Sequence, residues 1–219
     1  MAGRTSYRLF DITLARRTQV SASLVRFTFT GPQVGQTATH APDQRIKLFF
    51  PQDANGLEAL LEIAKLEEHD WFGAYRALPD AERPPMRTYT IRALHPARGE
   101  VDVEFVLHGD NGPASRWAMR ARPSDRLAMT APLASAGGEK LGYEWKPPRG
   151  VRRILIVADE TALPAAAGIF ETLDDLPLAP RVEASSKYRV GTISSPSLPP
   201  PSCAGCPAIA SRVATTAIC

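Results

Sequence analysis

The first part of the chain alternates apolar and polar residues at every second position. The alternation runs through 7–30 and returns over 44–50, where Ile46, Leu48 and Phe50 share one side. Side chains of a β-strand point alternately to the two faces of a sheet, so this period predicts strands with one buried face. We interpret these strands as the opening of an antiparallel barrel.

The period changes to a helical one at 57–68, where leucines recur three and four residues apart with charged residues between them. This spacing predicts a short amphipathic helix inserted between strands. The aromatic residues at 71–75 are expected to pack in the core, since aromatic side chains dominate core burial. Alternation then returns at 101–107, a helix is expected over 114–121, and the last barrel strand begins near Leu127.

A polar connection over 137–150 separates the barrel from a different pattern. Residues 151–158 form a continuous apolar run, followed by an acidic and hydroxyl-bearing turn and a helix over 163–173. Continuous apolar runs are typical of parallel strands buried on both faces. Strand, turn and helix predict the first unit of a nucleotide-binding α/β domain, although the GxGxxG fingerprint is absent.

The pattern ends shortly after Arg181 and Val182, which would begin a second parallel strand. From about 184 onward the chain is rich in Ser, Pro, Ala and Thr, with four prolines between 196 and 201. Such a composition cannot bury enough apolar surface to offset its ordering entropy. We therefore predict a disordered low-complexity tail over 184–219, with a frameshift as its simplest origin, and poor packing of the short parallel sheet.

The net charge of the chain indicates no further class of partner. The tail carries Lys187, Arg189 and Arg212 and no acidic residue, and without these three the 26 basic residues become 23, equal to the 23 acidic ones. The basic balance therefore belongs to the tail and predicts no nucleic-acid partner. No apolar run approaches the roughly 20 residues that a bilayer span needs, so we expect a cytoplasmic protein without membrane insertion.

All three cysteines, Cys203, Cys206 and Cys219, also lie in the tail. A structural zinc site needs four ligands, and no second cysteine pair or histidine follows this CxxC. A redox CxxC needs a βαβ context that the tail lacks. The sequence therefore predicts no metal site.

One short segment combines the groups that a flavin nucleotide would need. Arg87–Arg92 (RTYTIR) follows two prolines and is rich in β-branched and aromatic residues, which predicts a strand. Arg87, Tyr89 and Ile91 then share one face, and Thr88, Thr90 and Arg92 share the other. A guanidinium can grip phosphate, an aromatic ring can stack on a flat ring, and a hydroxyl can bind its edge.

A second segment, 105–118, predicts an anion site. A strand ends at His108, a Gly/Asp/Asn/Gly turn follows, and Pro113 begins a helix. Proline at the first helical position loses no backbone hydrogen bond, and the free N–H groups behind it favour negative charge. Together these features predict a cradle for a pyrophosphate.

These two segments and Asp159–Ala165 (DETALPA) together resemble the siderophore-interacting proteins, the FAD-containing ferric-siderophore reductases of the ferredoxin-reductase superfamily. The resemblance covers roughly 7–182. It implies a six-stranded antiparallel FAD-binding barrel over 1–136, a linker over 137–150 and a truncated parallel α/β NAD(P)H-binding domain over 151–183. The family usually has glycine where this chain has Ser124 and Ala131, which makes the backbone there less permissive.

The resemblance also implies roles for individual residues. Arg87 would bind phosphate, Tyr89 would stack on the flavin ring and Thr90 would lie at its polar edge. The remaining cofactor-binding residues implied are Thr88, Arg92, His108, Gly112, Pro113, Ala114 and Ser115 around FAD, with Asp159 and Thr161 on the nicotinamide side. Lys47 and Arg45 are candidates for contacting an anionic ferric siderophore.

In the resembling family, NAD(P)H reduces the flavin and the flavin reduces siderophore-bound iron, so no catalytic acid, base or nucleophile is expected. We expect such a reductase, acting as a monomer, with activity possible only as far as the truncated second domain allows. Two alternatives stay open: a flavin- or siderophore-binding module or inactive fragment without hydride transfer, and a plain β-barrel interaction protein without cofactor.

Overall fold

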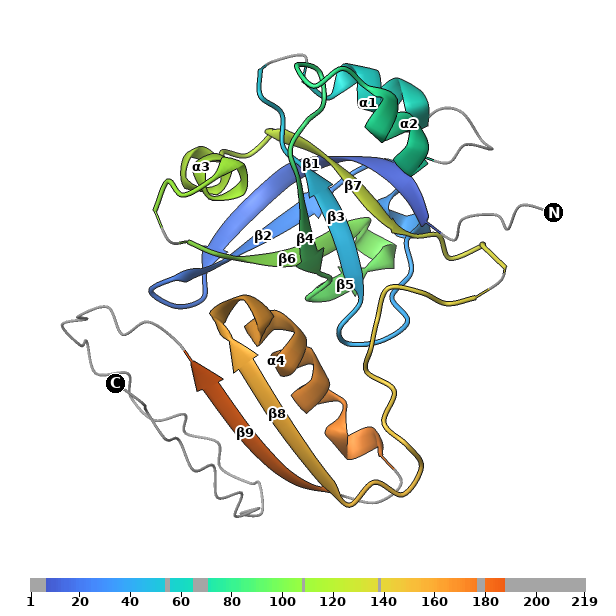
Figure 1. The fold of residues 1–219 in the computed structure, drawn as a ribbon, viewed down its shortest axis with the longest axis vertical. Coiled ribbons are helices and arrows are strands. Elements are labelled where there is room, and N and C mark those ends of the chain that lie inside the picture. Colours follow the sequence, from blue (N-terminus) through green and yellow to red (C-terminus); the bar gives the residue numbers. More distant parts are fainter. Residues whose placement is uncertain are drawn as a thin grey trace.

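The computed structural model describes residues 7–53, 56–64, 71–107, 109–137, 139–176 and 180–187. Its first part is a β-structure with three short helices, and its second part is a small α/β unit (Figure 1). The strands of the first part are β1 Tyr7–Gln19, β2 Leu24–Thr30, β3 Arg45–Phe49, β4 Met86–Thr90, β5 Ala93–His95, β6 Glu100–Val106 and β7 Arg126–Pro132, and its helices are α1 Glu58–Ala64, α2 Trp71–Ala77 and α3 Pro113–Arg120. The α/β unit contains β8 Arg153–Asp159, α4 Leu163–Glu171 and β9 Arg181–Lys187.

Among the described residues, seven strands form one antiparallel sheet in the order β4-β3-β7-β1-β2-β6-β5. The sheet curls until its two edges meet, because Ile91 and Arg92 alone separate β4 from β5. The Ile91 N–H donates to Gln44 O (2.9 Å), and the next N–H, from Arg92, donates to Asp102 O (2.9 Å). The predicted count of six strands was wrong by one, because the three residues of β5 are too few to show a period.

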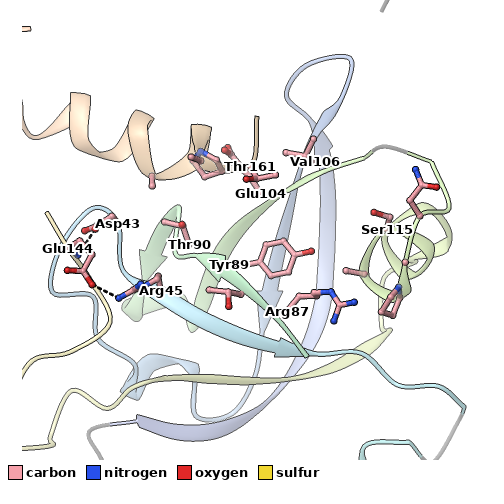
Figure 2. A pocket seen from close by; sticks show the side chains of 18 residues that line it. Asp43, Arg45, Arg87, Tyr89, Thr90, Glu104, Val106, Ser115, Glu144 and Thr161 are labelled. Carbon is pink, nitrogen blue, oxygen red and sulfur yellow. Dashed lines mark hydrogen bonds and ion pairs between the residues drawn. The ribbon is translucent and has the colours of Figure 1, made fainter. Parts of the chain in front are cut away.

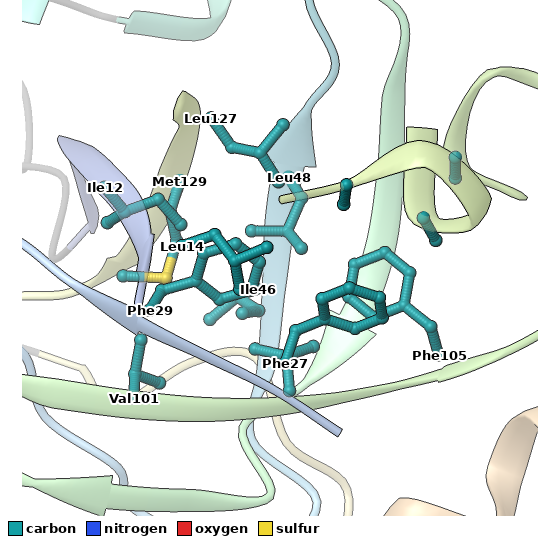
Figure 3. Close-up of a cluster of buried hydrophobic side chains, with 14 of the residues drawn as sticks. Ile12, Leu14, Phe27, Phe29, Ile46, Leu48, Val101, Phe105, Leu127 and Met129 are labelled. Atoms are coloured by element: carbon teal, nitrogen blue, oxygen red, sulfur yellow. The ribbon is translucent and has the colours of Figure 1, made fainter. Parts of the chain in front are cut away.

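The interior of the curled sheet is filled by one apolar cluster (Figure 3). Phe27, Phe29 and Phe105 are almost fully buried, and the rings of Phe27 and Phe105 lie 4.8 Å apart in an edge-to-face arrangement. Trp117 of α3 packs against Phe27 at 5.6 Å, so the helix covers one end of the cluster. Burying each large apolar side chain stabilises the fold by about 1.5–3 kcal/mol, which makes this cluster the main source of stability.

A second cluster lies between the sheet and the inserted helices. Phe49 packs edge-to-face against Tyr75 of α2 at 5.2 Å, and Leu60 of α1 is fully buried beside them. The Tyr75 hydroxyl donates to Pro84 O (3.0 Å), which satisfies its buried polar atom. The prediction that the aromatic residues at 71–75 belong to the core is confirmed for Tyr75, whereas Phe72 is exposed. Of the predicted helix 57–68, the described part is α1.

In the α/β unit, β8 and β9 pair in parallel and α4 lies between them and the curled sheet (Figure 1). The apolar run over 151–158 is typical of a strand buried on both faces, but Leu155 is 69% and Val157 is 74% exposed, which agrees with the predicted poor packing of the short parallel sheet. The helix covers one face, and no described residue covers the other. Strand β9 runs to Lys187, so the boundary expected at 184 falls inside a strand. Residues 188–219, including the three cysteines, lie outside the described residues.

No described helix is long and apolar enough to cross a bilayer.

Candidate functional site

A cavity of about 500 Å³ lies where the curled sheet, α3 and the α/β unit meet (Figure 2). Its volume is in the range of small-molecule and cofactor sites. Segments far apart in the sequence contribute to its wall: the strand β4, the turn and first residues of α3, the residues that open α4, and the chain around β3 and β6. The lining residues are Asp43, Arg45, Arg87, Thr88, Tyr89, Thr90, Glu104, Val106, Asn111, Gly112, Pro113, Ala114, Ser115, Glu144, Thr161, Ala162, Pro164 and Ala165.

Four consecutive residues of β4, 87–90, line the cavity, which a strand in the middle of a sheet could not achieve. Arg87 pairs with Leu48 and Tyr89 with Ile46, on the side of the apolar interior, as the predicted alternation requires. Thr88 pairs with Lys47 on the opposite side. Both faces reach the cavity because β4 is an edge strand of the sheet.

Tyr89 places a flat ring in the wall of the cavity. The ring stacks on Phe105 with a centroid distance of 4.2 Å and an interplanar angle of 30°. Burial raises the pKa of the Tyr89 phenol far above its ordinary value, so the side chain is neutral at physiological pH. A neutral aromatic ring fixed by a second ring suits contact with a planar ligand.

The opposite end of the cavity is formed by the start of α3. Gly112 caps this helix at φ 145°, a conformation that favours glycine, and Pro113 occupies the first helical position. The Arg116 N–H already donates to Gly112 O (2.9 Å), so the N–H groups of Ala114 and Ser115 are the ones left without a helical acceptor. Arg87 lines the same cavity and is exposed. This end therefore attracts an anion, as the sequence predicts.

The α/β unit contributes Thr161, Ala162 and the first turn of α4. Asp159 does not line the cavity; its Oδ1 accepts hydrogen bonds from the N–H groups of Thr161 (2.9 Å) and Ala162 (3.1 Å) and from the Thr161 hydroxyl (2.6 Å). Asp159 thus caps the turn Glu160–Ala162. The resemblance implies that Asp159 lies beside the cofactor. In the structure Asp159 instead holds Thr161, and Thr161 lines the cavity.

Three other predicted residues have protein partners. Arg92 is not among the described residues that line the cavity; its guanidinium donates to Glu171 of α4. Lys47 donates to the Thr88 hydroxyl (2.5 Å), and Arg45 lines the cavity while pairing with Glu144 (2.7 Å). Figure 2 shows Arg45 and Glu144 at one end of the cavity and Ser115 at the other. His108 lies outside the described residues.

Two acidic residues that line the site were not predicted. Glu104 of β6 lines the cavity with a side chain only 4% exposed, and Asp43 lines it beside Arg45. Asp43 Oδ2 accepts from the N–H groups of Glu144 (2.7 Å) and Trp145 (2.9 Å), whereas its Oδ1 is buried without a hydrogen-bond partner. A buried carboxylate oxygen without a partner is costly, so a ligand donor would stabilise it. Alternation predicts that Glu104 faces away from the barrel interior, but no local pattern indicates what covers that face.

The cavity thus brings together an anion-binding helix start, a guanidinium, a fixed aromatic ring and a hydroxyl, on the edge of a curled antiparallel sheet that is followed by an α/β unit. These groups fit a flavin dinucleotide, which needs a cradle for its pyrophosphate and a flat, partly polar wall for its ring. The fold and the site therefore define a flavin-binding domain of the ferredoxin-reductase type.

Comparison with known proteins agrees with this class. A ferredoxin reductase of carbazole 1,9a-dioxygenase has the same fold, with a TM-score of 0.52 at 13% identity over 84% of this chain and 43% of that protein. A siderophore utilization protein from T. fusca has a TM-score of 0.63 at 25% identity, over 89% of this chain and 66% of that protein. The NADPH-dependent ferric-chelate reductase of Escherichia coli (strain K12) is 31% identical over 188 residues.

Residues 13–136, more than half of the chain, match the siderophore-interacting FAD-binding domain. The chain belongs to this family, and its cofactor is FAD. The alternative of a plain barrel without cofactor is thereby set aside. The match to the Escherichia coli reductase includes 85% of this chain but 65% of that protein, so the chain spans about two thirds of the length of this relative.

Proposed function

We propose that this chain binds FAD in the cavity between the curled sheet and α4 and takes part in the reduction of ferric iron held by a siderophore, with NAD(P)H as the electron donor. The observation that carries the proposal is the single cavity lined by Tyr89, by Gly112 and by Thr161. Those residues come from the three segments that the sequence analysis selected, and all three segments line the same cavity.

Residue roles follow from the geometry. The Arg87 guanidinium and the N–H groups at the start of α3 would hold the diphosphate, because both present donors to an anion. Tyr89 would support the ring system and the Thr90 hydroxyl would bind its polar edge. When bound, FAD accepts two electrons as hydride and delivers them singly to ferric iron. Protein groups bind and orient, and no acid, base or nucleophile is assigned.

The ferric siderophore would approach the end of the cavity that contains Arg45. Siderophores hold ferric iron through hard, anionic oxygen donors, and a guanidinium can attract such a complex. Arg45 is half-exposed and its partner Glu144 is mostly exposed, so the pair can open at low energetic cost. Lys47, which is held by Thr88, would add positive charge on the same strand.

The electron donor is the part of the proposal most affected by the short α/β unit. In the part of the chain that the structure describes, two parallel strands and one helix follow the barrel. We infer that hydride transfer from NAD(P)H is slow or impaired in this chain. The competing proposal is a flavin-binding module that receives electrons from another donor, and the exposure of Leu155 and Val157 favours it.

Purification and spectroscopy separate these functions. The full chain should purify with, or take up, FAD, and its visible spectrum should show bound flavin. Under anaerobic conditions, bleaching by NADH or NADPH supports the reductase, whereas bleaching only by dithionite supports the binding module. In either case, reoxidation of the reduced flavin by a ferric siderophore tests the substrate class, with the iron-free siderophore as control. A chain that binds no FAD would refute the proposal.

A further inference from the structure

A row of four charged side chains crosses the junction between the curled sheet and α4. Arg26 donates to Glu104 Oε1 through Nη2 (2.6 Å) and Nε (3.0 Å). The Nε of Arg92 lies 3.8 Å from the same oxygen. Arg92 also donates to both carboxylate oxygens of Glu171, one at 2.9 Å. The row therefore joins β2, β6 and the segment after β4 to the last residue of α4.

Arg92 is the central member of this row. Its side chain is 14% exposed, and the side chain of Glu104 is 4% exposed. A planar guanidinium that donates to two oxygens of one carboxylate has both its position and its orientation fixed. The hydrogen bonds to Glu171 raise the pKa of Arg92, and they lower the pKa of Glu171 in turn. Nη1 and Nη2 thus both point at Glu171, and the buried Nε, which has no hydrogen-bond partner among the described residues, faces Glu104.

The same face of α4 makes a second, close contact, with the turn that precedes β3. A Cβ added at Gly168 would lie 2.8 Å from Pro42 O and 3.1 Å from Pro42 Cβ. Gly168 and Glu171 are three residues apart, so both lie on one face of the helix. The close backbone contact at Gly168 and the ion pair with two hydrogen bonds at Glu171 together fix the distance and the rotation of α4 relative to the sheet.

The opposite end of α4 opens into the cavity. Thr161, Ala162, Pro164 and Ala165 line it, and about 9 Å of helix separate Ala165 from Glu171. On the sheet side, Arg92 follows Thr90 by two residues, so a displacement of Arg92 is transmitted along the chain to Thr90. The row of charges therefore connects the two walls of the cavity: Glu104 lines it, and the pair Arg92–Glu171 lies outside its lining.

We propose that Arg92 is a positioning residue: paired with Glu171, it holds α4 so that Thr161 and Thr90 face one cavity, and it does not bind the phosphates of FAD. The meaning of this arrangement for electron transfer rests on the proposed function, but the contact itself does not. Sequence resemblance alone had placed Arg92 beside the cofactor, and its geometry assigns it to the junction.

Hydrogen–deuterium exchange of the FAD-free full chain tests the contact directly. Glu171→Gln removes the charge that Arg92 pairs with, and Asp174→Asn, a change of the same kind at an exposed site nearby, is the control. We expect amides of α4 and β8 to exchange about tenfold faster in Glu171→Gln than in the control, with β1 and β2 unchanged. Equal exchange in the two variants would overturn the proposal.

FAD affinity distinguishes positioning from phosphate binding. Glu171→Gln and Arg92→Gln should each weaken FAD binding by less than about threefold, and their effects on exchange in the double variant should not add, because both remove one interaction. If Arg92→Gln weakens FAD binding tenfold more than Glu171→Gln does, Arg92 is a cofactor ligand and the proposal is wrong. Should Arg92→Gln fail to fold, the exchange experiment on Glu171→Gln still decides whether the pair positions α4. If the unmodified chain binds no FAD, the proposed function fails while the exchange result stands.

Discussion

The curled sheet and the α/β unit both contain strongly apolar strands, but they cover them differently. Phe27 and Phe29 of β2 are fully buried by neighbouring strands, by α3 and by each other. Leu155 and Val157 of β8 are as apolar and are mostly exposed. The same strand chemistry therefore yields a closed core in one region and a one-sided layer in the other. Burial depends on the neighbours that the topology supplies, and the α/β unit has one covering helix among the described residues.

The difference assigns separate tasks to the two regions. The sheet and α3 supply the rigid groups of the cavity, namely the stacked Tyr89 ring and the start of α3. The α/β unit supplies a smaller part of the wall, and it is held by few contacts, of which the Arg92–Glu171 pair is the most specific. Stability and cofactor affinity should therefore reside mostly in the sheet.

The largest expected effect comes from truncating the core. Phe105→Ala should lower the free energy of unfolding by about 3–5 kcal/mol, because Phe105 is 1% exposed and the change leaves a cavity. Leu155→Ala in the α/β unit should change it by less than about 0.5 kcal/mol. Urea unfolding followed by tryptophan fluorescence measures both. Similar losses for the two variants would mean that β8 is as well packed as the sheet.

Next in size is the loss of a phosphate contact. Arg87→Gln should weaken FAD binding about 100-fold, since a hydrogen bond to a charged group is removed, while stability stays unchanged because Arg87 is exposed. Thr161→Val, on the α/β side of the same cavity, should weaken it by less than about threefold. Titration of the FAD-free protein, followed by flavin fluorescence, gives both constants. A reversed order would place the main grip on the cofactor in the α/β unit.

A smaller effect, of opposite sign, is expected within the sheet. Ser124 has φ 80°, the left-handed conformation, at the turn where the resembling family usually has glycine. Ser124→Gly should therefore raise the free energy of unfolding by about 0.5–1 kcal/mol, because glycine adopts this conformation without steric cost. Thermal unfolding would detect the change, and Ser135→Gly, at an exposed site without a left-handed φ, is a suitable control. A loss of stability would show that the turn is not strained.

The smallest expected effect concerns stability at acidic pH. Hydrogen bonds from Arg16 and Arg98 hold the pKa of Glu100 at about 2, below its ordinary value of 4.5. A lowered carboxyl pKa adds stability above pH 4.5 and loses it as the pH falls towards 2. Because the partners Arg16 and Arg98 are half-exposed or more, solvent screens this contribution. Glu100→Gln should slightly flatten the decline of the melting temperature over that range, and an unchanged pH profile would contradict the pairing.

Much of the sheet and half of the site follow from local sequence. Alternation, and residue composition for β4, located six of the seven strands in the curled sheet. The prediction that Arg87 and Tyr89 share one face and Thr88 lies on the other was correct. Glycine before Pro113 predicted the start of α3, because that combination restricts the backbone locally. These inferences succeed since their causes lie within a few residues of the feature.

The misses have distant causes. Arg92 lies on the predicted face, but its partner Glu171 is 79 residues away and no local pattern connects them. The apolar run at 151–158 correctly predicts a strand, yet its exposure depends on which neighbours cover it. Asp159 is an intermediate case: an acidic residue directly before a helical turn is a common cap, and that local signal could have identified its role.

The two residues that join β4 to β5 link loss of the cofactor to unfolding of the sheet. Strand β4, which would contact FAD in the proposed site, is also the strand at which the curled sheet closes on itself. Opening the sheet between β4 and β5 would therefore also disrupt the proposed FAD site. Bound FAD would in turn stabilise the closed sheet, because it binds only the folded state. We expect release of bound flavin and thermal unfolding of the sheet to occur at the same temperature.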